Sequence, residues 1–304
     1  MNIYKPILAV GSIALDTLET VHGNRNEILG GSATYFAAAA GLLAPVKLVG
    51  VVGNDFPQAG WDLFQSRSIN TDNVLRQNGV TFRWGGRYSP DYSTRDTLFT
   101  ELGVFENFLP EINETDKSTP LVFLGNIQPD LQSNVACETS TAEYIVMDTM
   151  NLWIDLFPEK LREVFGLAQI LLINHEEAEQ VTGKSDIGAA ATALLDAGPE
   201  IVVIKQGADG AYLAQGDYRL SVPVYPVDKV IDPTGAGDSF AGGFMAYLSL
   251  HANPDFLDAV VFGSAMASFC VEGFSVEALM SATKENFYHR VATIKEAMLE
   301  PNNG

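Results

Sequence analysis

Short apolar runs alternate with amphipathic stretches along most of this chain. The runs predict buried strands at Ile7–Val10, Lys47–Val52, Leu121–Leu124, Tyr144–Met147, Ile170–Ile173 and Ile201–Ile204. The stretches between them predict helices at Ser32–Leu43, Gly60–Ser66, Leu152–Phe165, Glu176–Val181, Ile187–Ala197, Ala236–Leu250, Phe256–Val271 and Thr283–Met298. Continuous apolar strands that alternate with helices are typical of a parallel sheet covered by helices on both faces. The pattern therefore predicts an α/β fold.

One region departs from this rhythm. Between Val80 and Phe105, aromatic residues stand among polar residues and glycines without a helical period. Such a segment predicts short strands joined by turns. From the pattern alone, these strands form either a hairpin of the main sheet or a separate small sheet.

Composition narrows the class of partner. The 304 residues carry a net charge of −20, and a negative surface repels the phosphate backbone of nucleic acids. The apolar run from Ile7 to Leu15 is too short to span a bilayer. Cys137 and Cys270 are too few for a disulfide framework, which favours a reducing compartment. We expect a cytoplasmic protein without a nucleic-acid or membrane partner, built as one large domain or two smaller ones.

A glycine-rich segment, Asp232 to Phe244, follows a strand that we expect to end near Ile231. Gly235, Ala236 and Gly237 have little or no side chain, so their backbone N–H groups can close around an anion. The start of the predicted helix adds partial positive charge at the same point. The segment is suited to binding a phosphate group.

Asp238 comes directly after these small residues. Beside a bound phosphate, its carboxylate would face a substrate hydroxyl, which is the position of a general base. An isolated Asp at the start of a helix is more often only a cap. Two glycines follow inside the helix, Gly242 and Gly243, and each lowers the stability of the helix by about 1 kcal/mol relative to Ala. Their presence indicates that another group approaches the helix backbone closely at this point.

This segment resembles the C-terminal signature of the ribokinase-like (PfkB) family of carbohydrate and nucleoside kinases, D-x-T-G-A-G-D-x-F. The stretch from Gly30 to Gly41 is similar to the family's Gly-Gly turn and Ala-rich helix, and Val49 to Asp55 resembles the strand and turn that follow. Asn174 to Gly183 resembles its N-x-x-E motif. The resemblance implies a three-layer α/β/α sandwich with a mostly parallel central sheet. It also implies a single domain over residues 1–304, with a small β-sheet lid from about 12–30 and 80–105.

The resemblance places the acceptor beside the first strand. The position that Asp16 matches accepts hydrogen bonds from substrate hydroxyls, although by itself Asp16 is also compatible with a turn. Gly30 and Gly31 permit close approach of the substrate, or form only an entry turn for the helix. Many members of the family have Asn where this chain has Tyr35. A phenol offers a flat apolar face and one hydroxyl in place of an amide, so the acceptor need not be ribose or fructose in the usual pose.

The resemblance places the nucleotide near Asn174 and on the loop that holds Lys205, Gly207 and Gly210. Glu177 would hold Mg²⁺ through water, because magnesium sheds its hydration reluctantly. As isolated residues, Asn174 is typical of an N-cap and Glu177 of a residue on a helix surface. Lys205 either reaches a phosphate or is a solvated lysine.

The resemblance further implies a monovalent-cation site, for K⁺, at Asp232 and Thr234. The expected activity is an ATP-dependent and Mg²⁺-dependent phosphoryl transfer to a hydroxyl of a small sugar or cyclitol, with Asp238 as the base. Two alternatives stay open: a nucleoside kinase of the same fold, in which Tyr35 or a lid aromatic stacks on the base, and a silent metabolite sensor. The resemblance is also compatible with a homodimer formed through the lid.

Overall fold

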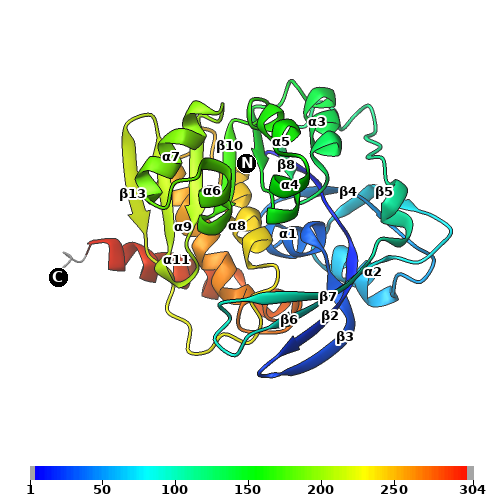
Figure 1. Cartoon of the computed structure of the whole chain (residues 1–304). Helices are drawn as coiled ribbons and strands as arrows, with labels where there is room; N and C mark the ends of the chain where they lie inside the picture. Colours follow the sequence, from blue (N-terminus) through cyan, green and yellow to red (C-terminus); the bar gives the residue numbers. More distant parts are fainter. Residues whose placement is uncertain (1–3, 300–304) are drawn as a thin grey trace.

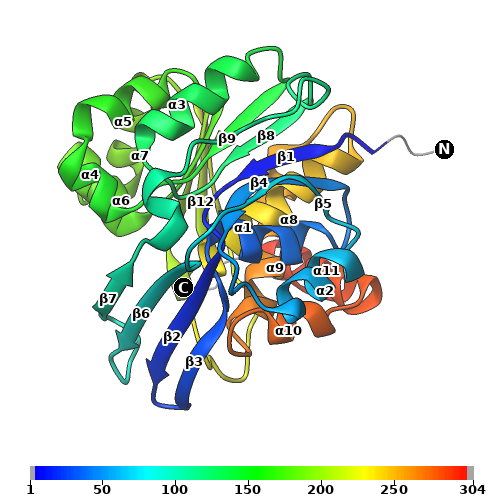
Figure 2. The same ribbon diagram turned by 90° about the vertical axis from the view of Figure 1, so that its right-hand side faces the viewer.

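The computed structural model describes residues 4–299, which form two sheets (Figures 1 and 2). In this part of the chain the larger sheet has nine strands in the order β13-β12-β11-β10-β9-β8-β1-β4-β5. Its strands are β1 (Ile7–Val10), β4 (Val46–Val52), β5 (Asn70–Arg76), β8 (Leu121–Leu124), β9 (Tyr144–Met147), β10 (Ile170–Asn174), β11 (Ile201–Lys205), β12 (Ala211–Gln215) and β13 (Tyr218–Val222). The strands from β11 to β5 run parallel, and β12 and β13 add an antiparallel edge. The mostly parallel sheet is confirmed.

Helices cover both faces of this sheet (Figure 2). They are α1 (Ser32–Ala40), α2 (Gln58–Ser66), α3 (Pro129–Glu138), α4 (Asn151–Leu156), α5 (Pro158–Phe165), α6 (His175–Thr182), α7 (Ile187–Asp196), α8 (Ala236–Leu250), α9 (Phe256–Cys270), α10 (Glu277–Ser281) and α11 (Lys284–Leu299). Alternate residues of β1 point to opposite faces. Ile7 packs with the cluster under α1, α8 and α9, whereas Leu8 packs with the cluster under α3, α5 and α7. The three-layer α/β/α sandwich is confirmed.

The second sheet projects from one end of the sandwich (Figure 2). Its order is β3-β2-β6-β7, from β2 (Ala14–Thr20), β3 (Gly23–Gly30), β6 (Phe82–Tyr88) and β7 (Arg95–Glu101). The aromatic segment therefore belongs to a separate small sheet and not to the main one. Its strands lie within the two segments expected to form the lid, whereas the role of a lid stays a prediction.

Two local predictions are wrong. The helix predicted over Leu152–Phe165 is divided at Phe157, because Pro158 has no N–H group to continue the ladder of hydrogen bonds. The strand expected to end near Ile231 is also absent, since the described chain between β13 and α8 has no strand. Pro223, Pro226 and Pro233 lie in that segment and cannot donate to a sheet.

Candidate active site

The carboxyl ends of three neighbouring parallel strands bring the polar residues of the site together. Asp148 follows β9, Asn174 ends β10 and Lys205 ends β11. Asn174 and Lys205 are direct partners in the strand register. Ligands of open α/β sheets bind at this edge.

The start of α8 faces the same edge. Gly235 has φ +76° and precedes the helix, and a Cβ atom at this position would overlap the ring of Tyr35. A Cβ atom at Gly237 would lie 3.1 Å from Nζ of Lys205 and 3.8 Å from Oδ2 of Asp148. The N–H groups of the first turn have no partner within an α-helix, although here that of Ala236 donates to the carbonyl oxygen of Pro233 at 3.2 Å. The small residues thus leave a cradle of backbone donors beside the ammonium group of Lys205.

Asp238 lies in the first turn of α8 and is half-buried. Desolvation and, to a smaller extent, the negative charge of Asp148 raise its pKa to about 7, against the opposing effect of Lys205. A carboxylate with a pKa near 7 accepts a proton more readily than an ordinary Asp and is still ionised in a large fraction of molecules at neutral pH. The environment of Asp238 is suited to a general base.

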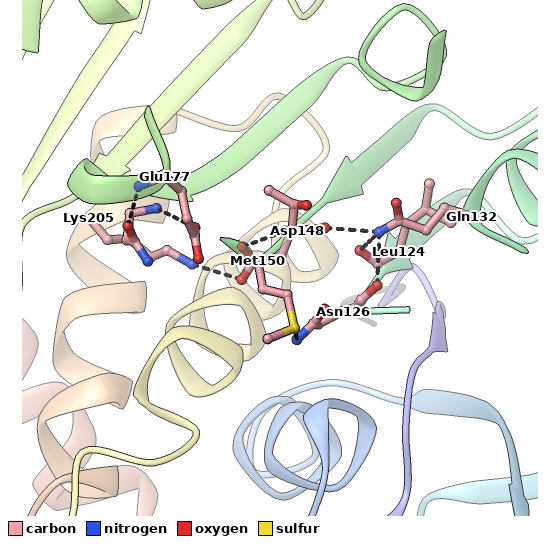
Figure 3. A network of polar contacts seen from close by, with 10 residues as sticks. Leu124, Asn126, Gln132, Asp148, Met150, Glu177 and Lys205 are labelled. Atoms are coloured by element: carbon pink, nitrogen blue, oxygen red, sulfur yellow. Dashed lines mark hydrogen bonds and ion pairs between the residues drawn. The ribbon is translucent and has the colours of Figure 1, made fainter. Parts of the chain in front are cut away.

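Lys205 lies beside the buried carboxylates of Asp148 and Glu177, which together form an acidic cluster (Figure 3). Its Nζ is 2.7 Å from Oδ2 of Asp148. Burial of Glu177 and, to a smaller extent, the negative charge of Asp148 raise the pKa of the Glu177 carboxyl group to about 7. Burial lowers the pKa of Lys205, but the two carboxylates raise it more, so the lysine stays charged. Lys205 is not a solvated surface lysine, because its side chain is only 14% exposed.

Buried Gln132 on α3 fixes the backbone beneath this cluster. Its Nε2 donates to the carbonyl oxygens of Asp148 and Gly125, each at 2.9 Å. The amide thereby joins the ends of β8 and β9 (Figure 3). The place of Asp148 directly after a buried strand is a signal in the sequence for a polar contact at this edge, whereas Gln132 lies within a helix and has no such signal.

Asp16 forms the opposite side of the site, on β2. Any side chain at Gly30 would overlap the carboxylate of Asp16, and Gly31 has φ +87° with a Cβ position blocked by the carbonyl oxygen of Ser12. Burial of Asp16 raises its pKa to about 8, and the charges of Asp232 and Asp238 contribute to the increase. The structure therefore brings Asp16, Gly30 and Gly31 together near Asp238. A buried carboxylate of this kind requires donors such as hydroxyl groups.

Asn174 and Glu177 form a capping box at the start of α6. Oδ1 of Asn174 accepts from the N–H of Glu177 at 2.8 Å, and Oε2 of Glu177 accepts from the N–H of Asn174 at 3.1 Å. Asn174 is therefore the N-cap, but Glu177 is only 5% exposed and is not a surface residue. Whether either residue contacts a nucleotide stays a prediction.

The donor set of the cluster fits Mg²⁺ held through water. Each of the two carboxylates already has a partner, since Asp148 pairs with Lys205 and Glu177 closes the capping box. Within residues 4–299, no three His, Cys, Asp or Glu side chains converge closely enough to ligate a metal directly. Magnesium commonly keeps several waters and binds through one or two carboxylates plus phosphates.

Asp232 and Thr234 precede the glycines. Asp232 is fully buried, and its Oδ1 accepts from the N–H of Thr234 at 3.0 Å. Its Oδ2 lies 3.5 Å from the backbone nitrogen of Ser275, a long contact that leaves this oxygen weakly satisfied. Burial raises the pKa of Asp232. These features fit a cation, but the K⁺ site stays a prediction.

Gly207, Gly210 and Tyr35 were also predicted as site residues, but the structure gives them indirect roles. Gly207 and Gly210, at φ +59° and +95°, shape the turn after β11 and thereby position the end of that strand. Tyr35 is only 1% exposed, and its ring is covered by Gly235. In this conformation the aromatic face of Tyr35 cannot stack on an acceptor. Its hydroxyl is buried without a hydrogen-bond partner in the described part of the chain.

Comparison with known families agrees with this geometry. A model of the family described as "pfkB family carbohydrate kinase" matches residues 130–282, which include the acidic cluster and the start of α8. The chain belongs to this family. It is therefore an ATP-dependent kinase of the ribokinase type, a phosphotransferase with an alcohol group as acceptor.

Two relatives cover most of this PfkB chain. It is 29% identical to a cytidine kinase of Thermococcus kodakarensis over 79% of the chain and 87% of that protein. It is 25% identical to a nucleoside kinase of Methanocaldococcus jannaschii over 88% of the chain and 90% of that protein. Among solved structures, a nucleoside kinase of Burkholderia thailandensis in complex with inosine superimposes with a TM-score of 0.79, at 21% identity and coverage of 94% and 97%. This last similarity supports the fold.

Proposed function

We propose that this kinase transfers the γ-phosphoryl group of ATP to a hydroxyl of a nucleoside, with Asp238 as the general base. The observation that carries the proposal is the placement of two carboxylates with raised pKa values, Asp16 and Asp238, near the glycine cradle of α8. Asp16 would hold acceptor hydroxyls, and Asp238 would take the proton from the hydroxyl that attacks. The cradle of Gly235, Ala236 and Gly237 would stabilise the charge of the transferring group.

Mg²⁺, held through water near Glu177 and Asp148, would neutralise phosphate charge when ATP is bound. Lys205 would compensate negative charge at the edge of the cradle, where its ammonium group already lies beside Gly237. Asn174 would position the N-terminus of α6 against the nucleotide, and the turn of Gly207 and Gly210 would border it. K⁺ near Asp232 and Thr234 belongs to the same proposal.

The choice of a nucleoside rests on the two relatives that cover most of the chain, a cytidine kinase and a nucleoside kinase. Since the face of Tyr35 is covered, the aromatic side chains of the small sheet are better placed to contact a base. Trp84 on β6 is half-buried and is one such side chain.

A free sugar or cyclitol is the second candidate. It is supported by the family's description as carbohydrate kinases and by a fructokinase relative that is 33% identical over 40% of the chain. The same arrangement of Asp16 and Asp238 would serve such an acceptor, because it recognises hydroxyl groups and not a base. A homodimer through the lid is likewise proposed, with Leu98 and Phe99 of β7 exposed at 38% and 36%.

Release of ADP from Mg-ATP, measured over a panel of nucleosides, sugars and inositols, tests the choice of acceptor. We expect stimulation by nucleosides and not by the corresponding free ribose. Stimulation by a sugar or cyclitol alone would replace the nucleoside with the second candidate. Binding of ATP without stimulation by any member of the panel would contradict the proposed function and favour a sensor.

A further inference from the structure

The tip of the β6–β7 hairpin is attached to the segment that leads into α8 (Figure 1). The hydroxyl of Tyr88 lies 3.0 Å from Oγ1 of Thr234, and the hydroxyl of Tyr92 donates to the carbonyl oxygen of Ile231 at 2.9 Å. Thr234 immediately precedes Gly235. These two contacts therefore place the hairpin tip directly beside the glycine cradle.

Arg95 is the first residue of β7 and stands opposite Tyr88 in the strand register. Its guanidinium lies 5.2 Å from the centre of the Trp84 ring, in the range of a cation–π contact. Directly opposite residues of an antiparallel pair have their side chains on the same face of the sheet, so Arg95 shares the face of Tyr88. Because the hydroxyl of Tyr88 contacts Thr234, this face of the hairpin meets the segment that leads into the cradle.

The other arginines of this hairpin are already neutralised. Arg83 pairs with Asp55 and Glu27, and Arg87 pairs with Glu19. Arg95 is exposed, and in the described part of the chain it makes no ion pair with a carboxylate. In a chain with 38 acidic and 18 basic residues, an unpaired arginine beside an acidic site has a free fork of donors for an anionic ligand.

We propose that Arg95 is a catalytic residue that binds the γ-phosphoryl group during its transfer; this rests on the proposed function. In that step the acceptor oxygen forms a bond to the γ-phosphorus, the bond from that phosphorus to the β,γ-bridging oxygen breaks, and the proton of the acceptor hydroxyl goes to Asp238. Arg95 gains and loses no proton. It donates hydrogen bonds to the equatorial oxygens, which carry the charge of the transition state.

The placement of Arg95 on the hairpin has a consequence for water. In this proposal the guanidinium meets the γ-phosphoryl group only while Tyr88 and Tyr92 hold the hairpin tip against residues 231–234. The complete set of charges is therefore present only when the small sheet covers the site, which favours transfer to the acceptor over hydrolysis of ATP.

Arg95→Ala, Arg95→Lys and the matched control Arg87→Ala test this assignment. Arg87 lies on the neighbouring strand, is exposed and pairs with Glu19, so its removal changes the charge of the hairpin equally without touching the site. We expect Arg95→Ala to lower kcat by on the order of 10²-fold, as for loss of one donor to a developing charge, with the KM of the acceptor changed only a few-fold. Arg95→Lys keeps the charge but lacks the planar fork, and we expect it to recover only part of the rate. Arg87→Ala should behave as wild type.

Binding of ADP alone and of ADP with aluminium fluoride, a mimic of the transferring group, provides a second readout. We expect Arg95→Ala to weaken binding of the mimic at least tenfold and binding of ADP little. Unchanged kcat in Arg95→Ala, equal loss in Arg87→Ala, or a change confined to the KM of the acceptor would each overturn the assignment. If wild type shows no turnover with any acceptor, the proposed function fails; turnover in wild type that is equal in Arg95→Ala defeats only the role of Arg95.

Discussion

Replacement of Gly235 by Ala tests the packing that forms the glycine cradle. Gly235 has φ +76°, a left-handed conformation that costs a residue with a Cβ atom about 1 kcal/mol or slightly more. The added methyl group would also overlap the ring of Tyr35. Because Tyr35 is only 1% exposed, the ring cannot move into solvent, and overpacking of this kind costs about 2 kcal/mol. The sum predicts a loss of about 3 kcal/mol in the free energy of unfolding.

Gly237→Ala is the matched control, two residues further along the same turn. Outside its own helix, the nearest atom to a Cβ at Gly237 is Nζ of Lys205 at 3.1 Å, the end of a flexible side chain. Since Ala is favoured over Gly within a helix by about 1 kcal/mol, we expect the stability of Gly237→Ala to be equal to wild type or higher.

Urea denaturation followed by circular dichroism measures both differences. Because the shift of the backbone at Gly235 also moves the cradle, we expect kcat to fall in Gly235→Ala together with stability. A Gly235→Ala protein as stable as Gly237→Ala would refute the reasoning, because neither the left-handed conformation nor the contact with Tyr35 would then carry a cost.

Two predictions concern the acidic groups of the site. The pKa of Asp16 is raised from its ordinary value near 4 to about 8, so the folded state retains a proton that the unfolded state releases, and stability should fall as pH rises from about 4 to about 8. Because Asn does not titrate, the variant Asp16→Asn should lack this decline, which amounts to on the order of 5 kcal/mol in the free energy of unfolding. A variant whose stability falls with pH as steeply as that of wild type would contradict the raised pKa of Asp16 as the cause. Asp148→Asn removes a negative charge that raises the pKa of both Asp238 and Glu177. The acid limb of the pH–rate profile, measured at low concentrations of both substrates, should therefore move to lower pH by about one unit. Asp217→Asn, in the exposed turn between β12 and β13, is the control, and an equal profile in both variants would exclude Asp148 as the source of the shift.

The central strands of the fold were predictable because both of their faces are buried. Strands such as β1 and β11 have no polar residue except at their ends, so they appear in the sequence as continuous apolar runs. The edge strand β5 (Asn70–Arg76) contains four polar residues before its first apolar one and was not predicted. Its pairing with β4 depends on tertiary contacts, which leave no periodic signal in the sequence.

The glycine cradle and Asp16 could be located because each belongs to a motif with restricted chemistry. Gly235, Gly31 and Gly30 occupy positions where the structure leaves no room for a side chain or requires positive φ. Arg95 could not be located in this way. It lies among polar residues of an exposed strand, and its place opposite Tyr88, beside the segment that holds Thr234, arises only when segments far apart in sequence fold together.

The membrane and dimer predictions differ in their support. Within residues 4–299, none of the helices is both long and apolar enough to cross a bilayer. The homodimer through the small sheet stays a prediction, as does a cytoplasmic location. Exposed Leu98 and Phe99 offer a direct site for variants in a sedimentation experiment.

The most direct test of the account is the kinase activity of Asp238→Asn, measured as acceptor-dependent release of ADP, together with the affinity of the variant for ATP. The amide has nearly the same size as the carboxylate but cannot accept the proton of the acceptor. The account predicts a fall in kcat on the order of 10²-fold or more with affinity for ATP preserved. Turnover close to that of wild type would contradict the role of Asp238 as general base.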